Sequence, residues 1–262
     1  MDSLTAFILG LIQGLTEFLP VSSSGHLEIG KALFGVEAEK SLTFTVVVHG
    51  ATVLSTIVVF WRDLGDLFKG SVTLKWNEQN KYLLKILVSM IPVMIVGLFF
   101  KDEVEGFFNG NITFVGSMLL ITALLLAAAH FMKSGNKNIP YSNAFVIGIA
   151  QALAVLPGIS RSGATISTGL MLRNNKDEVT RFAFLMVLVP IIAANVLDLM
   201  SGEMSGSNGV GTLQLLIGFV TAFVSGWIAC KWMLKIVRKG KLIWFAVYCL
   251  IVGVIAIISG QI

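Results

Sequence analysis

Residues 6–26 read AFILGLIQGLTEFLPVSSSGH, and residues 144–164 read AFVIGIAQALAVLPGISRSGA. Each stretch begins with an apolar helix of about 13–16 residues, which is too short to cross a hydrocarbon core of about 30 Å comfortably. A proline and a cluster of serine and glycine follow. Such a break exposes backbone N–H and C=O groups, which a membrane tolerates only where protein or a water-filled cavity surrounds them. We therefore predict re-entrant helix–loop–helix hairpins over 4–34 and 143–172.

The rest of the chain is also strongly apolar. Of the 262 residues, 55% are hydrophobic and 13% are charged, against about 45–50% and 25% in soluble domains. This excludes a disordered chain, a nucleic-acid-binding domain and an ordinary cytosolic enzyme. Cys230 and Cys249 both lie in apolar runs. This is typical of small core residues and not of a disulfide or metal pair. Six segments are long enough to span a membrane: 43–61, 83–100, 112–132, 182–200, 211–234 and 242–260.

The two hairpin sequences form an internal repeat about 138 residues apart. Each half, 1–132 and 133–262, would hold one hairpin and three spanning helices. Because three is odd, the second half must have the opposite orientation, and the two Ser/Gly breaks would approach each other from opposite faces. The predicted fold is an all-α integral membrane protein with six transmembrane helices and two re-entrant hairpins in an inverted-topology repeat, built as a single membrane domain.

The positions of the basic residues predict the orientation. In this topology Lys31, Lys40 and Lys101 lie on one side, and the remaining 16 of the 19 basic residues lie on the other. Such a bias places the second side in the cytoplasm. Both termini and the first hairpin would then face outward. The first residues, MDSLTAFILG, lack the basic region and cleavage site of a removable signal peptide.

Glu17 is a candidate functional residue because it lies in an otherwise apolar helix. A carboxylate at membrane depth costs roughly 3 kcal/mol or more unless it is paired. Gln13 precedes it by four residues, so the two side chains share one helix face. The structural alternative is a Glu that bonds to backbone freed by Pro20.

Ser22, Ser23, Ser24, Gly25 and His26 follow the first break. Hydroxyl groups and glycine at a helix start offer donors to an anion. The alternative is plain N-capping, for which one serine suffices. Ser23 and His26 are three residues apart, and a serine within reach of an imidazole is the minimal nucleophile–base pair.

Arg161 lies in the second break, with Ser160, Ser162, Gly163 and Thr165 around it. A guanidinium flanked by hydroxyl and N–H groups suits a phosphate oxyanion. The alternative, compatible with the first, is a structural ion pair with Glu17 across the repeat interface.

Other polar residues give weaker signals. We interpret His49 and His130 as packed or interfacial histidines and Asp198 as interfacial, while Glu28 could belong to the rim of the site. The chain has no CxxC, HExxH, Walker or dinucleotide motif.

Two long motifs carry a family resemblance. QGLTEFLPVSSSGH (13–26) and PGISRSGAT (157–165) in one chain resemble bacterial undecaprenyl-diphosphatase of the bacitracin-resistance type. The first matches that family's (E/Q)xxxE motif and its serine cluster, and the second matches PGxSRSxxT. The resemblance runs over the whole chain. Gln13 occupies the first motif position, so any metal role there must use an amide oxygen.

The resemblance implies hydrolysis of undecaprenyl diphosphate to the monophosphate and inorganic phosphate, which recycles the lipid carrier for cell-wall synthesis and gives bacitracin resistance. It implies a multi-pass protein of the bacterial plasma membrane, with its active site on the outer face, that binds a lipid substrate and no nucleic acid. A homodimer is left open. It also implies Mg²⁺ or Ca²⁺ as cofactor, with Gln13 and Glu17 as metal ligands.

The same resemblance assigns roles residue by residue. Glu17 would be the essential acidic residue, Ser23 the candidate nucleophile, His26 the acid/base partner and Arg161 the phosphate clamp. The residues implied in phosphate binding are Ser22, Ser24, Gly25, Ser160, Ser162, Gly163 and Thr165. The competing hypothesis is a transporter of polyprenyl phosphate, because inverted repeats with paired hairpins and a midplane anion site are transporter features.

Overall fold

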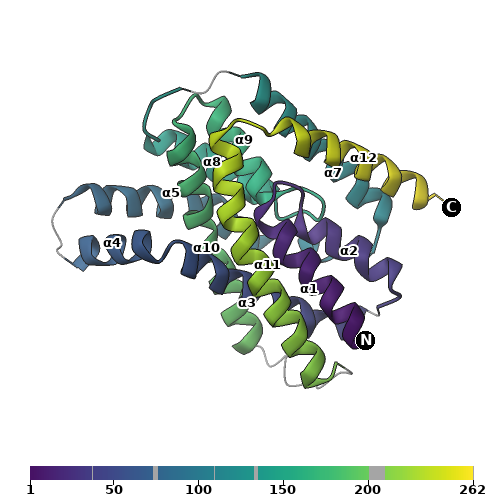
Figure 1. Ribbon diagram of the computed structural model, residues 1–262. Coiled ribbons are helices and arrows are strands. Elements are labelled where there is room, and N and C mark those ends of the chain that lie inside the picture. The colour runs from purple at the N-terminus through teal and green to yellow at the C-terminus, as the bar shows by residue number, and fades with distance from the viewer. Residues whose placement is uncertain (37, 73–75, 109, 133–134, 201–209, 262) are drawn as a thin grey trace.

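The computed structural model describes residues 1–36, 38–72, 76–108, 110–132, 135–200 and 210–261, except for the side chains of 38–42, 105, 193–200 and 238. Within these ranges the chain is helical and contains no strand (Figure 1). The helices are α1 (Ser3–Phe18), α2 (Ser23–Leu33), α3 (Ala38–Val59), α4 (Trp61–Val72), α5 (Glu78–Phe99), α6 (Lys101–Glu105), α7 (Ile112–Phe131), α8 (Tyr141–Leu153), α9 (Arg161–Met171), α10 (Lys176–Met200), α11 (Thr212–Arg238) and α12 (Ile243–Ser259).

Both predicted hairpins are present as pairs of short helices. The first consists of α1 and α2, with 16 and 11 residues, and the second of α8 and α9, with 13 and 11 residues. Pro20 and Pro157 lie in the connections between the two helices of each pair. Proline cannot donate a backbone hydrogen bond, so neither helix continues through it: α1 ends at Phe18, before Pro20, and α8 ends at Leu153, before Pro157.

The two halves of the chain interlock. The first helix of the first hairpin, α1, packs along α11, and its counterpart α8 packs along α5. Figure 1 shows α1, in purple, beside the yellow-green α11. The last helix of the first half, α7, packs along the last helix of the second, α12, and α11 also packs along α3. The first helix of each hairpin therefore has its largest contact with a helix of the opposite half.

Small residues allow these helices to approach closely. A Cβ atom at Gly10 of α1 would lie 2.6 Å from the carbonyl oxygen of Gly218 in α11, and one at Gly116 of α7 would lie 2.7 Å from that of Gly253 in α12. Backbone-to-backbone contact of this kind is typical of helix packing in membranes, where interfaces are enriched in small residues.

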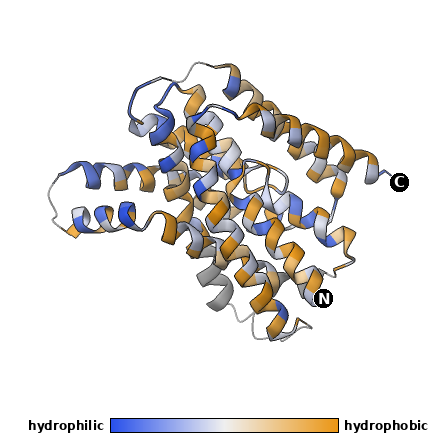
Figure 2. Ribbon diagram, viewed as in Figure 1, coloured by the Kyte–Doolittle hydropathy of each residue, from blue (hydrophilic) through white to orange (hydrophobic). Residues whose placement is uncertain are grey.

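The outer surface is suited to lipid. Large apolar side chains are exposed on the outward faces of the long helices, including Leu98 (73%), Leu124 (70%) and Ile255 (60%). Figure 2 shows these helices as predominantly hydrophobic along their length, with the hydrophilic residues concentrated towards helix ends and connections. Soluble monomers rarely expose apolar surface on this scale.

Length and composition alone qualify α5, α7 and α11 to cross a membrane, and α3 with α4 would be a fourth span if that bent pair is counted as one. α12 is shorter, at 17 residues, and the end of α10 falls where side chains are not described. The chain is therefore a multi-pass helical membrane protein.

The segment after the first predicted span differs from expectation. The sequence suggested a connecting loop over 62–82, whereas the chain bends by 75° after Val59 and continues as α4. α4 mixes charged residues with apolar ones and packs against the start of α5. The amphipathic spacing of Trp61, Leu64 and Phe68 accounts for a helix where the charges indicated a loop.

We predict that Gly10→Ala destabilises the fold by about 1–3 kcal/mol, because the new methyl group meets backbone that no rotamer change can move. Gly97→Ala is the matched control, since a Cβ there has no neighbour within 4 Å. Thermal unfolding in detergent can be followed with a thiol-reactive dye, because Cys230 and Cys249 are free and buried. Equal melting temperatures for the two variants would contradict the close α1–α11 contact.

Candidate active site

The tips of the two hairpins touch each other, as the repeat predicted. The Ser162 hydroxyl of the second tip donates to the Leu19 carbonyl of the first, at 3.3 Å. A Cβ on Gly25 would lie 3.0 Å from the Cα of Gly158. Gly158 itself has φ of +102°, and a Cβ there would lie 2.5 Å from the Val115 carbonyl oxygen. Only glycine fits this position without strain.

The second helix of each hairpin begins in the same way. Ser22 caps α2 by accepting from the Gly25 N–H at 3.2 Å, and Ser160 caps α9 by accepting from the Gly163 N–H at 3.0 Å. In each tip the capping hydroxyl also lies 3.4 Å from the hydroxyl two residues later. The repeat therefore extends to individual hydrogen bonds, and both helices start where the tips meet.

Thr122 of α7 holds the second tip in place. Its hydroxyl donates to the Gly158 carbonyl at 3.1 Å and accepts from the Ser160 N–H at 3.0 Å. These are backbone groups freed by the break at Pro157, and they are buried. One side chain from outside the hairpin thus satisfies two of them.

Glu17 is the centre of a polar network on the first hairpin. Its Oε2 accepts from Gln13 Nε2 at 3.0 Å and from the Ser23 hydroxyl at 2.6 Å. The carboxylate therefore accepts hydrogen bonds from side chains. The alternative, in which Glu17 bonds to backbone groups freed by Pro20, is not observed among the described residues. Because the Ser23 proton points to Glu17, the lone pairs of the Ser23 oxygen are directed elsewhere.

The spacing in the sequence suggested Ser23 as the partner of His26, but the imidazole contacts other groups. Its Nδ1 lies 2.8 Å from the Ser22 carbonyl oxygen, and its Nε2 lies 2.8 Å from the Tyr248 hydroxyl of α12. The His26 and Tyr248 rings are stacked, with centroids 5.5 Å apart. A carbonyl only accepts, so Nδ1 carries the proton, and in the neutral ring Tyr248 donates to Nε2. Ser23 bonds to Glu17 and not to this imidazole.

Arg161 and Glu17 line one pocket between the hairpins, α3 and α10. Among the described residues Glu17 and Arg161 form no ion pair within 4 Å, so the structural alternative is not realised as a direct contact. The polar wall of the pocket consists of Glu17, Arg161, Ser162, Thr165, Thr52 and Thr56, and the apolar wall of Phe18, Val53, Ala183, Phe184, Val187, Leu188 and Ile191.

The pocket separates the predicted phosphate-binding residues into two groups. Ser162 and Thr165 line it. Ser22 and Ser160, in contrast, are 3% and 1% exposed and are occupied as caps. The N–H groups of Gly25 and Gly163 are occupied by the same caps, and Ser24 lies beside the Ser22 hydroxyl.

Gln13 carries the feature that best fits a metal ion. Its side chain is fully buried, its Nε2 donates to Glu17, and its Oε1 has no hydrogen-bond partner. A buried orphan amide oxygen next to a carboxylate is a suitable donor set for a hard divalent cation. Within the described part of the chain no three His, Cys, Asp or Glu side chains are grouped to hold a metal by themselves.

The remaining described candidates are not among the residues that line the pocket. His130 is exposed, and its Nδ1 lies 3.1 Å from the Gly240 carbonyl oxygen. Glu28 pairs with Lys31, and His49 bonds to the Thr45 carbonyl. The side chain of Asp198 lies outside the described residues. No sequence pattern indicated Thr122, Tyr248, Thr52 or Thr56, because their positions depend on contacts between helices that are distant in the chain.

The fold and the pocket together define a multi-pass helical membrane protein in which a carboxylate and a guanidinium line one pocket between two helical hairpins. The family of the bacitracin resistance protein BacA matches residues 6–255, and the chain belongs to this family. An undecaprenyl-diphosphatase of Bacteroides fragilis is 54% identical over 100% of this chain and 99% of its own length. Those of Christiangramia forsetii, with 55% identity and 98% coverage of both chains, and Carboxydothermus hydrogenoformans, with 40% identity and 97% and 96% coverage, are also similar.

We predict that Thr122→Val destabilises the protein by about 1–3 kcal/mol, because it leaves the buried Ser160 N–H and Gly158 C=O without a partner. Thr122→Ser keeps the hydroxyl and should stay within about 1 kcal/mol of the native protein. The dye-monitored thermal unfolding described above measures both. A Val variant as stable as the Ser variant would mean that the tip does not depend on this hydroxyl.

Proposed function

We propose that this protein hydrolyses undecaprenyl diphosphate to undecaprenyl phosphate and inorganic phosphate. The observation that carries the proposal is the pocket in which Glu17 and Arg161 face one space with an apolar wall. A prenyl diphosphate needs both a cationic hydroxyl-rich site for its phosphates and an apolar path for its tail. The relatives described above are named for this reaction, which favours hydrolysis over the transport alternative.

Glu17 and Ser23 supply the nucleophile in this proposal. The Ser23 oxygen attacks the terminal phosphorus while its proton passes to Glu17 Oε2, 2.6 Å away. The bond from that phosphorus to the bridging oxygen breaks, and undecaprenyl phosphate leaves. Water then hydrolyses the phosphoserine to release phosphate. If water attacks directly, Glu17 takes the proton from that water instead. The acceptor for the Ser23 proton is thus the carboxylate, in place of the His26 imidazole.

Arg161 stabilises the charge that develops on the transferred phosphoryl group. Guanidinium N–H groups match phosphate oxygens in geometry, and electrostatic stabilisation is the main contribution in phosphoryl transfer. Within the described residues no hydrogen bond from the Arg161 side chain to protein is present, so its donors are free for substrate. Ser162 and Thr165, one and four residues further on in α9, line the same wall.

In its protonated form, which carries a proton on Nε2, His26 acts as proton donor to the leaving oxygen in this scheme. Tyr248 keeps the ring oriented in both protonation states, because a phenol oxygen donates to a neutral Nε2 and accepts from a protonated one. The stacked ring restricts rotation of the imidazole.

The proposed orientation puts this site on the outer side of the plasma membrane. The distribution of Lys and Arg supports it, and the interlocked packing of α1 on α11 and α8 on α5 supports two halves of opposite orientation. We propose six spanning segments, α3, α5, α7, α10, α11 and α12, in addition to the two hairpins.

The direct test is release of inorganic phosphate from a prenyl diphosphate by the purified protein in detergent with magnesium or calcium. We expect release from the native protein, and a loss of at least about 100-fold in Arg161→Lys, because an ammonium cannot reproduce the forked donors. No release by the native protein, together with movement of lipid phosphate across vesicle membranes, would instead support transport.

Two further variants separate the possible nucleophiles. Glu17→Gln keeps the shape and removes the proton acceptor, so turnover should fall under either mechanism. Ser23→Ala should abolish phosphoserine formation. A Ser23→Ala variant that retained most of the rate would assign the attack to water.

We also predict dependence on a divalent cation held by Gln13 and Glu17. When bound, the cation would neutralise charge on the diphosphate. Chelation should abolish phosphate release, and Gln13→Glu should retain activity at lower metal concentrations, since a carboxylate binds Mg²⁺ or Ca²⁺ more tightly than an amide. Titration of the metal against activity and against melting temperature measures both effects. Full activity in excess chelator would exclude the cation.

A further inference from the structure

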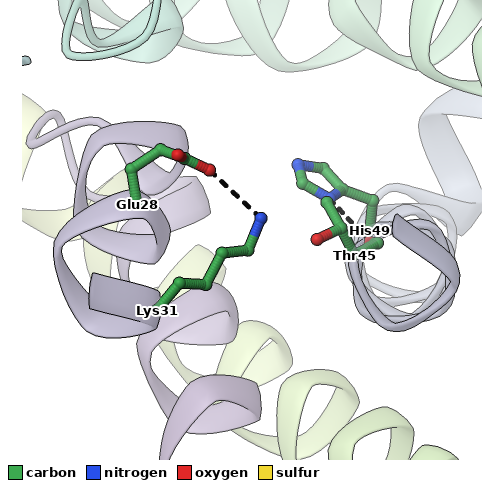
Figure 3. A network of polar contacts seen from close by, with 4 residues as sticks. All are labelled: Glu28, Lys31, Thr45 and His49. Atoms are coloured by element: carbon green, nitrogen blue, oxygen red, sulfur yellow. Dashed lines mark hydrogen bonds and ion pairs between the residues drawn. The ribbon is translucent and has the colours of Figure 1, made fainter. Parts of the chain in front are cut away.

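A second polar cluster lies outside the pocket lining, on α2 and α3. Lys31 and Glu28 form an ion pair of 3.1 Å with side chains that are only 15% and 12% exposed. His49 of α3 faces this pair from across the gap between the helices (Figure 3). Charged groups that are nearly buried in a membrane protein are costly and are usually functional. None of these three side chains has a role in the hydrolysis proposed above.

Only one of the two nitrogens of the His49 ring contacts a hydrogen-bond partner among the described residues. Its Nδ1 lies 2.9 Å from the Thr45 carbonyl, which can only accept, so Nδ1 is the donor. Nε2 is then an acceptor in the neutral ring, and no protein partner for it is present in the described part of the chain. In Figure 3 this nitrogen lies on the side of the ring that faces Glu28 and Lys31, and no dashed line joins it to either.

Lys31 also has unused donors. An ammonium has three N–H groups, and Glu28 Oε1 accepts one of them. The open Nε2 of His49 and the remaining N–H groups of Lys31 thus face a common space. A cationic donor and an imidazole that can gain a proton together suit the oxygens of a phosphate group.

The cluster adjoins the pocket. The His49 carbonyl accepts from the Thr52 hydroxyl at 2.8 Å, and Thr52 lines the pocket. His49 therefore lies one turn of α3 from the pocket wall, and Figure 3 shows Lys31 across from it.

We propose that Lys31 and His49 form a second phosphate-binding subsite, adjacent to the one that Arg161 provides. Glu28 holds the Lys31 ammonium in place until a phosphate oxygen competes for it. The inference rests on the proposed hydrolysis, since a diphosphate carries two phosphate groups and Arg161 serves one. The bound group is either the second phosphate of the lipid diphosphate or the inorganic phosphate that leaves.

Lys31→Gln tests the subsite. We expect the KM for a prenyl diphosphate to rise about 10-fold or more while kcat changes less, because a charge-assisted hydrogen bond is lost. Lys81→Gln is the matched control, because Lys81 forms an equivalent i,i+3 pair with Glu78 at 2.8 Å that is exposed to solvent. If the subsite serves the released product, the inhibition constant for inorganic phosphate should rise and the KM should stay unchanged.

The double variant Glu28→Gln with Lys31→Gln distinguishes binding from structure. If the pair only stabilises α2, removing both charges should restore the native KM and inhibition constant, and this result would overturn the proposal. If Lys31 binds phosphate, the double variant should stay as impaired as the single one. His49→Gln should weaken binding in the same direction.

A binding readout keeps this test separate from the proposed reaction. Inorganic pyrophosphate should raise the melting temperature of the native protein and raise that of Lys31→Gln less. Equal protection of both, with unchanged KM and phosphate inhibition, would remove the subsite while leaving hydrolysis intact. Absence of phosphate release by the native protein would instead remove the proposed reaction, and the protection experiment would still report on Lys31.

Discussion

The structure depends on how the tips of the two hairpins satisfy their backbone. At each break, buried N–H and C=O groups lose their helical partners and must find others within the protein. The two tips solve this with their own capping serines and with each other, through the bond from Ser162 to the Leu19 carbonyl. Thr122 completes the second tip from a neighbouring helix. Because the tips must meet to be satisfied, Glu17 and Arg161 are brought to one pocket.

The charges of Glu17 and Arg161 in this pocket do not neutralise each other through a direct ion pair. Ion pairs buried in a protein usually form when two opposite charges are within reach, since an uncompensated charge is expensive. Glu17 instead bonds to Gln13 and Ser23, and Arg161 makes no direct ion pair with it. A phosphate group can therefore enter beside Arg161 without first breaking a salt bridge. Hydrogen bonds to neutral groups keep Glu17 oriented in the meantime.

Features that follow from local rules could be predicted from the sequence, and features that depend on distant helices could not. Proline with serine and glycine defined both hairpins, and the four-residue spacing placed Gln13 against Glu17. The same kind of spacing suggested a pair between Ser23 and His26, but a carboxylate on the neighbouring helix is the stronger acceptor for the Ser23 hydroxyl. Tyr248 is 222 residues from its partner His26, and no local pattern reports such a contact. The bend into α4 was missed because its charges resembled those of a loop.

The packing of α1 against α11 also has a consequence for synthesis of the chain. The helix made first has its largest contact with a helix that begins at Thr212, so most of the polypeptide must leave the ribosome before α1 finds its partner. During that interval the first hairpin, with its buried glutamate and open backbone, has no complete protein environment. Assembly of the pocket is for this reason a late event, completed only when the second half of the chain has entered the membrane.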